Sequence, residues 1–565
     1  MKISKFFLLV AAISLVACKN DSIENNISYK ISSILLEEKP MLKVNITCKT
    51  EPNGKTSFLF LNDAWGEKDL HNTIHSIKAL HRDSNIEILK DSGWIVINHP
   101  KDLKTLKFEY IIKQDSEDML TTRTIYRPVI QPEYFHLFSH SLLMIPLEYS
   151  KEENDTFDVT IAWENFPEDY TIQNSFGSNE RFQDLKNITD RELSQSVFIG
   201  GDYRTHTLNI HNNKVAYTTR GHWETFNDST ILKILEKTIT AQRNFWKDHS
   251  QNYFSVNLTP TDEKKGSSFQ GTGLTNSFDC SATNNEYLEV EGLVYLFNHE
   301  LLHNWIGHII KNDNEEQQYW FSEGFTDYYT YKNIAKFSIN NLDEGFFIDK
   351  FNENIKSLFN SPVKEAPNSD INYKNFWENR DYGKLPYYRG ALFAFYLDQK
   401  IKQDSKGKQS LDDLMLAIKN DASKSEQKIS HPYFINKANE FLKDDISPFF
   451  KAHIEKGKLF NMESMLKNFG FEYDTKSTIF DLGFTFSQDR NSILAIDDSS
   501  EAYKAGLRAN DQIISRDYYN GSIEYKAEFI VLRNKKEIEI TYYPKREASI
   551  ITMKNNSYNK KQLNL

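Results

Sequence analysis

The sequence is poor in cysteine, glycine and proline, and it has no excess of positive charge. Its 565 residues include three Cys, 22 Gly and 14 Pro, and the low Gly and Pro content argues against long disordered tracts. The formal net charge of −11 gives no reason to expect nucleic acid as a partner, because a phosphate-binding surface requires clustered Lys and Arg. A chain of this length exceeds one hydrophobic core, so we expect about two to four domains.

The N-terminus has the organisation of an export signal. Lys2 and Lys5 precede an apolar run at residues 6–17 that is shorter than a membrane-spanning helix, and no other apolar stretch is long enough to span. The run ends in Leu-Val-Ala before Cys18, which resembles the lipobox of bacterial lipoproteins; an ordinary signal peptide is the alternative. We therefore expect a lipoprotein signal at residues 1–18 and a polar tether at 19–28. The protein would then be lipid-anchored through Cys18 to a bacterial membrane, extracytoplasmic, on the periplasmic side or the cell surface.

Hydrophobic patterning divides the remaining chain into three domains. Residues 29–195 alternate apolar and polar positions and are rich in Val, Ile, Phe and Thr, which predicts an all-β, sandwich-like domain. Residues 196–465 predict an α+β domain, in which a few strands precede long helices. Residues 470–553 return to short strands around one short helix. The polar tail after residue 553 is expected to be loose.

The expected secondary structure can be stated by residue range. Strands of the first domain are expected at 41–50, 56–63, 93–100, 105–114 and 156–165. Strands of the second are expected at 197–204, 214–220 and 253–258, and its helices at 231–249, 290–310, 321–337 and 389–401. Cys48 and Cys280 fall in different expected domains, and the sequence leaves open whether they pair.

The main chemical signal is an HExxH motif, which runs from His299 to His303 inside a helical pattern. Residues four apart leave the same face of a helix, so both imidazoles can bind one tetrahedral zinc ion. Glu300 lies one position further round the helix, where it can act as general base on the attacking water. With 15 His in the chain, the motif would arise by chance in roughly a few per cent of such sequences, so its surroundings decide.

A catalytic zinc also needs a third protein ligand. Glu323 begins a second helical pattern and is the expected ligand. Asp327 follows four residues later on the same face, where it can hydrogen-bond a ligand imidazole; a solvated helix face is the alternative. His308 does not have the metzincin spacing and is expected to be a packing or surface residue. We therefore expect one Zn2+ per chain, bound by His299, His303 and Glu323.

The segments HELLHNW and WFSEGFTDYY together resemble the gluzincin metallopeptidases, and within them most of all the glycyl aminopeptidase family. Members of that family combine a β-rich N-terminal domain, a thermolysin-like catalytic domain and a PDZ domain. The resemblance covers nearly all of the mature chain by order of parts, and it is specific around residues 271–398 and 479–515. It implies a zinc metallopeptidase with the ligands given above and Glu300 as its general base.

A second matching segment, LPYYRGAL at residues 385–392, resembles the PYxKG segment of gluzincin aminopeptidases. The tyrosine of that segment hydrogen-bonds the tetrahedral intermediate, and the resemblance gives this role to Tyr387. A phenol aimed at the developing oxyanion acts mainly in the transition state and so raises kcat. Tyr382 and Tyr388 are further candidates, and a tyrosine of the hydrophobic core is the alternative.

A third segment, GTGLTNS at residues 271–277, corresponds to a strand that lines the substrate cleft in the family. The resemblance implies substrate binding at Gly273 and Leu274. Thr275 replaces an acidic residue that binds the free amino group of the substrate in related aminopeptidases, and charge-assisted pairs are the strong ones. We therefore expect hydrolysis of peptides or protein fragments by an aminopeptidase or, alternatively, an endopeptidase. A non-catalytic peptide-binding surface lipoprotein is the remaining alternative.

The C-terminal segment resembles a PDZ domain. DLGF at residues 481–484 is similar to the carboxylate-binding loop, and residues 500–513 are similar to the helix and the turn after it. Asn510 occupies a position where Gly is usual, and Asn tolerates the left-handed backbone conformation well. Such domains bind extended peptides by strand addition, so the resemblance implies a peptide ligand; a purely structural module is the alternative.

Overall fold

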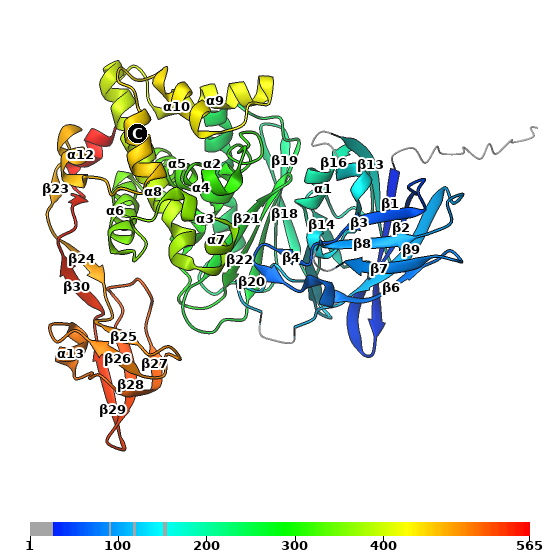
Figure 1. The fold of residues 1–565 in the computed structure, drawn as a ribbon, viewed down its shortest axis with the longest axis horizontal. Helices are drawn as coiled ribbons and strands as arrows, with labels where there is room; N and C mark the ends of the chain where they lie inside the picture. The colour runs from blue at the N-terminus through cyan, green and yellow to red at the C-terminus, as the bar shows by residue number, and fades with distance from the viewer. Residues whose placement is uncertain (1–25, 90–91, 117–119, 151–154) are drawn as a thin grey trace, which may run out of the picture.

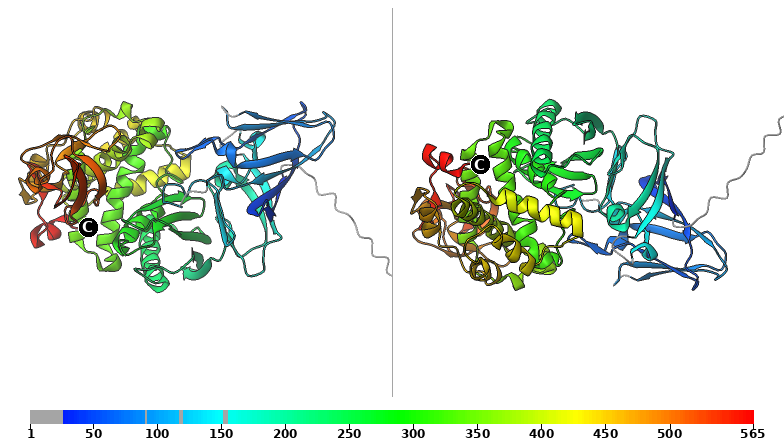
Figure 2. Two further views of the ribbon diagram at one scale, coloured as in Figure 1. Left: turned by 90° about the horizontal axis from the view of Figure 1, so that it is seen from below. Right: turned by 90° about the horizontal axis from the view of Figure 1, so that it is seen from above.

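The computed structural model describes residues 26–89, 92–116, 120–150 and 155–565. A β-rich part lies at one end of the molecule and the helices of a central mixed part at the other, with a small C-terminal part next to those helices (Figure 1); two further views show the β-rich part apart from the other two (Figure 2). Cys18 and the expected signal lie outside the described residues. Within those residues, no helix combines the length and the apolar composition needed to cross a membrane.

Three sheets form the N-terminal part. Their strands are β1 (Asn26–Leu36), β2 (Lys39–Lys49), β3 (Lys55–Leu59), β6 (Ile74–Ala79), β7 (Asn85–Leu89), β8 (Trp94–Asn98), β9 (Thr105–Ile112), β10 (Val129–Ile130), β11 (Tyr134–Phe138), β12 (Ile145–Pro146), β13 (Thr156–Glu164), β14 (Thr171–Asn174), β15 (Gly177–Ser178), β16 (Phe182–Thr189) and β17 (Val197–Gly201). The strand orders are β16-β13-β1-β2-β9-β6, β12-β3-β8-β7 and β10-β11-β17-β14-β15. A small hairpin, β4 (Asp63–Ala64) with β5 (Glu67–Lys68), extends toward the central part.

Alternating burial explains why these segments form strands. In β13, for example, every second residue is buried, as expected when one face of a strand covers a core. This confirms the β-rich character expected for residues 29–195. The third sheet continues past that range, because β17 pairs with β11 and β14. Cys48 and Cys280 are buried, separate and unpaired, each in a different hydrophobic core.

A five-stranded mixed sheet opens the central part. It contains β18 (Arg204–Ile210), β19 (Asn213–Thr219), β20 (Tyr253–Thr261), β21 (Phe269–Leu274) and β22 (Ser277–Thr283), in the order β18-β19-β20-β22-β21. Strands β19, β20 and β22 are parallel, and α2 (Asp228–Trp246) provides the crossover from β19 to β20. The order leaves β21 at the edge of the sheet, directly under the next helix, α3.

Helices make up most of the central part after β22. They are α3 (Val290–Leu302), α4 (Glu315–Ser322), α5 (Gly324–Lys336), α6 (Glu344–Asn360), α7 (Tyr373–Glu378), α8 (Arg380–Ser405), α9 (Leu411–Ser425), α10 (His431–Asn439), α11 (Ser447–Phe450) and α12 (Met462–Asn468). The helix expected at 290–310 ends at Leu302, and turns follow in which Gly307 has a φ of +122°. The helix expected at 389–401 already begins at Arg380 and runs through Pro386, which is buried.

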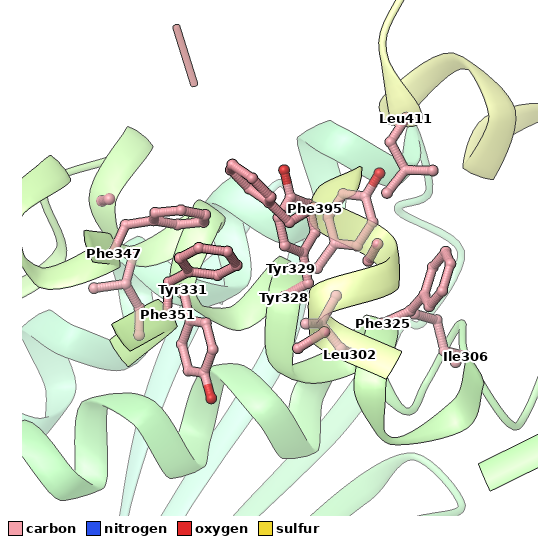
Figure 3. Close-up of a cluster of buried hydrophobic side chains, with 14 of the residues drawn as sticks. Leu302, Ile306, Phe325, Tyr328, Tyr329, Tyr331, Phe347, Phe351, Phe395 and Leu411 are labelled. Atoms are coloured by element: carbon pink, nitrogen blue, oxygen red, sulfur yellow. The ribbon is translucent and has the colours of Figure 1, made fainter. Parts of the chain in front are cut away.

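The helix expected at 321–337 is instead two helices that meet at Glu323. Helix α5 is buried at almost every position, and it packs against α2, α3, α6 and α8. Figure 3 shows part of this cluster, to which Phe325 and Tyr328 of α5, Leu302 of α3 and Phe395 of α8 all belong. The cluster holds α5 against α3, so the residues at the start of α5 have a fixed position relative to α3.

The C-terminal module comprises β25 (Phe484–Phe486), β26 (Ile493–Ile496), α13 (Glu501–Ala505), β27 (Gln512–Asp517), β28 (Ala527–Arg533) and β29 (Lys536–Tyr542). It has a hydrophobic core of its own, which includes Ala502 and Phe529. Asn510 has a φ of +70°, as expected for a residue in the place of Gly. The pairs β24 (Ser477–Phe480) with β30 (Lys545–Ala548), and β23 (Tyr473–Asp474) with β31 (Thr552–Met553), connect the module to the central part.

The polar tail is ordered, so the expectation of a loose tail after residue 553 is wrong. It forms α14 (Ser557–Leu563), in which the side chains of Asn559 and Leu563 are fully buried. The Asn559 amide donates hydrogen bonds to the backbone oxygens of Glu472 and Lys554 at 2.7 and 2.8 Å. The buried Leu563 side chain and the hydrogen bonds of Asn559 together hold this segment.

Candidate metal centre and active site

Two helices bring the three expected metal ligands together. His299 lies in the last turn of α3 and His303 directly after it, and their ring centroids are 4.9 Å apart. Oε2 of Glu323, at the junction of α4 and α5, lies 3.4 Å from Nε2 of His299 and 3.9 Å from Nε2 of His303. One possible ligand atom from each residue lies within 4.8 Å of the others, and the described residues contain no second group of this kind.

This arrangement fits a catalytic zinc ion. Oε2 of Glu323 is buried, and no described residue forms a hydrogen bond with it, which is costly unless another group binds there. Two imidazoles and one carboxylate are a ligand set of catalytic zinc, and they leave a fourth position for water or substrate. Glu323, His299 and His303 are therefore the residues that would hold the metal.

The ligands influence one another's protonation when no metal is bound. Burial alone would lower the pKa of His299, but the hydrogen bond to Asp327 and the carboxylate of Glu323, 3.4 Å away, outweigh burial and raise this pKa to about 10. Burial alone would raise the pKa of Glu323, but the nearby imidazoles of His299 and His303 lower it to about 2. A metal ion that replaces the proton on His299 would therefore supply the positive charge that the neighbouring carboxylates favour.

Asp327 supports the first ligand, as the sequence predicted. Its Oδ1 lies 3.0 Å from Nδ1 of His299, so Nε2 is free to face the metal. Two tyrosines that sequence reasoning missed also donate to Asp327, Tyr295 at 2.5 Å and Tyr331 at 3.0 Å. Tyr295 lies four residues before His299 and Tyr331 four residues after Asp327, so helical spacing was a signal that could have found both.

Glu300 is buried between α3 and the edge strand β21, with 6% of its surface exposed. Burial raises its pKa, and the positive charges of His299 and His303 act in the opposite direction. Gly271 makes this approach possible, because a Cβ atom there would lie 2.6 Å from Cγ and 2.8 Å from Oε1 of Glu300. A carboxylate with a raised pKa beside the ligands is suited to accept and return a proton.

Tyr387 lies beside the ligand residues, and its action on the intermediate stays a prediction. Its ring stacks on His299 with the centroids 6.0 Å apart, and its phenol lies near the carboxylate of Glu323. Burial, followed by the negative charge of Glu323, raises the pKa of Tyr387 well above its usual value, so the phenol stays protonated. A pair of glycines sets its position: a Cβ on Gly324 would clash with Gly390, so α8 can lie directly on the start of α5.

The remaining predicted residues lie on the edge strand β21, just after it, or beyond the end of α3. A Cβ at Gly273 would lie 2.7 Å from Cβ of His303, so this glycine permits close packing. The Leu274 side chain is buried in the core shared with the N-terminal part and does not line the site; substrate binding by these two residues stays a prediction. Thr275 is also buried. His308 does not belong to the ligand group, and burial lowers its pKa to about 3.

The N-terminal part supplies one wall of the site, which sequence reasoning missed. The Tyr126 hydroxyl donates a hydrogen bond to the backbone oxygen of Gly271 at 3.2 Å, and its pKa is raised by burial and by the charge of Glu300. The indole of Trp65, between β4 and β5, packs edge-on against Tyr126 with the centroids 5.4 Å apart. No local pattern could have indicated these contacts, because they depend on how two domains dock.

Comparisons with known proteins show the fold. No model of a known protein family matches the chain, and no curated protein matches it either. Among solved structures, an aminopeptidase N family protein from Idiomarina loihiensis has a TM-score of 0.72 at 16% identity, and the match covers 95% of this chain and 99% of that one. An M1 zinc metallopeptidase from Deinococcus radiodurans gives a TM-score of 0.48 at 12% identity, over 77% of this chain and 94% of that one. The first match shows that the chain has the fold of an aminopeptidase N family protein.

Proposed function

We propose that this protein is a zinc-dependent peptidase. The observation that carries the proposal is the buried, unpartnered Oε2 of Glu323 beside two imidazoles, with a buried carboxylate next to them. The aminopeptidase N-type fold supports the same conclusion. A zinc ion, when bound, would polarise the scissile carbonyl and make water a stronger nucleophile.

The chain's own residues perform the proton transfers. Glu300 takes a proton from the attacking water and delivers it to the leaving amine, a task for which its raised pKa is suited. Tyr387, as a neutral phenol, donates a hydrogen bond to the oxygen that becomes negative during the attack. Asp327 keeps His299 in the tautomer that can bind the metal.

The site also bears on which bonds are cut. The neighbour's description as an aminopeptidase N family protein supports the removal of N-terminal residues. Thr275, however, offers no carboxylate to a substrate's ammonium group, and its hydroxyl is buried without a partner among the described residues. This observation favours internal cuts, so an endopeptidase is the second candidate.

The test uses the full chain, purified in detergent and loaded with zinc, on peptides with free or acetylated N-termini. Mass spectrometry of the products identifies each cut. Loss of single N-terminal residues, from free peptides only, indicates an aminopeptidase; internal cuts in acetylated peptides indicate an endopeptidase. The Glu300→Gln variant should lose about 100- to 10,000-fold in kcat while it retains one zinc per chain. A zinc-loaded, folded protein that cuts no peptide would contradict the proposal and favour a peptide-binding protein.

We further propose that the mature protein is extracytoplasmic and lipid-anchored through Cys18, and that the C-terminal module is a PDZ-like domain that binds a peptide. The lipobox-like residues before Cys18 support the first, and Asn510 in its left-handed conformation supports the second. Mass spectrometry of the mature N-terminus should find a diacylated cysteine that Cys18→Ala removes. Binding of C-terminal peptides to the module, measured by calorimetry with the full chain, tests the second.

A further inference from the structure

Lys384 adds a positive charge beside the proposed active site. It lies in the second turn of α8, three residues before Tyr387, so both side chains leave the same face of the helix. Its Nζ atom is 4.1 Å from the centroid of the Tyr387 ring, and the side chain is exposed. Its charge also acts on Glu300, the proposed general base. The ammonium group therefore lies close to where the reacting bond would be.

Lys384 has no carboxylate partner within the described part of the chain. Among the residues that the structure describes, Lys384 forms no ion pair, whereas Lys400 and Lys402 on the same helix both do. The aromatic face of Tyr387 attracts the ammonium group without removing its charge. Such a lysine, exposed and held at a site, can form a charge-assisted hydrogen bond with an arriving anion.

The charges around the cleft point to one kind of substrate. At Thr275 the chain has a neutral, buried side chain where the resemblance predicts an anion that binds a substrate's ammonium group. The carboxylates of Glu300 and Glu323 serve as base and metal ligand, and that of Asp327 is engaged by His299, Tyr295 and Tyr331. Lys384 is a positive charge beside Tyr387 without such a partner among the described residues, which favours a negatively charged substrate group and disfavours a positive one.

We infer that Lys384 binds a carboxylate of the substrate next to the scissile bond, so that this enzyme prefers anionic peptides. The inference rests on the proposed peptidase function. The carboxylate can belong to an Asp or Glu side chain or to the C-terminus of a short peptide, because both present the same group to the ammonium. In this respect the site differs from one that selects its substrate by a free amino group.

The first experiment compares matched peptides on one enzyme. Internally quenched, C-terminally amidated peptides with free or with acetylated N-termini carry Glu, Gln or Lys next to the scissile bond, and a second set compares a free C-terminus with an amide. An exposed pair of charges contributes modestly, so we expect kcat/KM to be about fivefold higher for Glu than for Gln at low salt, mainly through KM. The ratio should fall toward one in about 1 M salt, where the screening length is about 3 Å. The second set shows whether the C-terminal carboxylate serves equally.

Variants assign the preference to Lys384. Lys384→Gln should reduce the Glu-to-Gln ratio to about one, and Lys384→Glu should invert it in favour of the Lys peptide. Because the ratio compares substrates on the same enzyme, any effect of Lys384 on Glu300 cancels. Lys374→Gln is the matched control, since Lys374 is an exposed lysine of the neighbouring helix α7, and it should keep the wild-type ratio.

A binding measurement separates this inference from the proposed function. Fluorescent Glu and Gln peptides are titrated against zinc-loaded Glu300→Gln protein, and anisotropy gives each Kd. Tighter binding of the Glu peptide, lost in the double variant with Lys384→Gln, supports carboxylate recognition even if no peptide is cleaved. Cleavage of all peptides with equal kcat/KM, or equal Kd values, would overturn the role of Lys384 and leave the peptidase function standing.

Discussion

Replacing Asp327 by Asn tests how strongly this carboxylate supports the metal site. Asp327 accepts hydrogen bonds from His299, Tyr295 and Tyr331 at 3.0, 2.5 and 3.0 Å. An Asn side chain has a single acceptor oxygen, so its amide would have to face one of these donors. Tyr331 cannot readily accept a hydrogen bond from this amide, because its hydroxyl already accepts one from Asn354 at 3.3 Å. The amide would then face His299 and Tyr295, and His299 would lose its acceptor. Loss of such a partner weakens metal binding by about 10- to 100-fold, which corresponds to about 1.4–2.8 kcal/mol.

The assay is a competition between the protein and a chromophoric zinc chelator at neutral pH. We expect the zinc Kd of Asp327→Asn to be about 10- to 100-fold higher than that of the wild type. Asp421→Asn is the matched control, because Asp421 of α9 also accepts from a tyrosine, Tyr433 at 3.0 Å, outside the metal site. Thermal unfolding of the zinc-free proteins identifies any loss of folding. A Kd within about twofold of the wild type would refute the reasoning.

Three further predictions concern catalysis, stability and pH. Tyr387→Phe should lower kcat by about 100- to 1,000-fold with little change in zinc content, and an unchanged kcat would remove this residue from the mechanism. Asp398→Asn should lower the free energy of unfolding in urea by about 3–5 kcal/mol, because Asp398 is fully buried beside Lys402 and Lys332 at 2.8 and 3.5 Å; a loss below about 1 kcal/mol would contradict this. The zinc-free pKa of His299 is about 10, above the usual 6.5, so its protonated form stabilises the fold fully below about pH 6.5 and this contribution is lost as the pH rises through about 10. Zinc binding between these values should release a proton, detected in weakly buffered solution, and the apparent affinity should rise about tenfold per pH unit; no release would contradict the shift.

Local helical spacing explains why much of the site could be predicted. His299 and His303 share one face of α3, and Glu323 and Asp327 are likewise four residues apart, so their mutual geometry is set by the helix itself. The same rule would have found Tyr295, four residues before His299, and Lys384, three residues before Tyr387. These two were missed because no motif drew attention to them.

Contacts between distant segments could not be read from the sequence. The hydrogen bond from Tyr126 to Gly271 depends on how two domains dock, and the place of β17 in the third sheet depends on its pairing with β11 and β14. The polar composition after residue 553 wrongly predicted a loose tail. Helix α14 is held there because Asn559 hydrogen-bonds backbone oxygens of Glu472 and Lys554. Such outcomes arise from long-range hydrogen bonds, which leave no periodic trace in one segment.

The connection between β24 and β30 makes the C-terminal module an insertion. Phe480 and Lys545 are register partners at its two ends, so the chain leaves and returns at adjacent points of one antiparallel pair. A two-residue turn can join strands at that spacing, so the module could be excised or exchanged for another without a new chain path. The strand β31 and the docked α14 would remain on the central part, since both lie beyond the return point. The C-terminal module can therefore be replaced by another domain at Phe480 and Lys545 without a change to the metal centre.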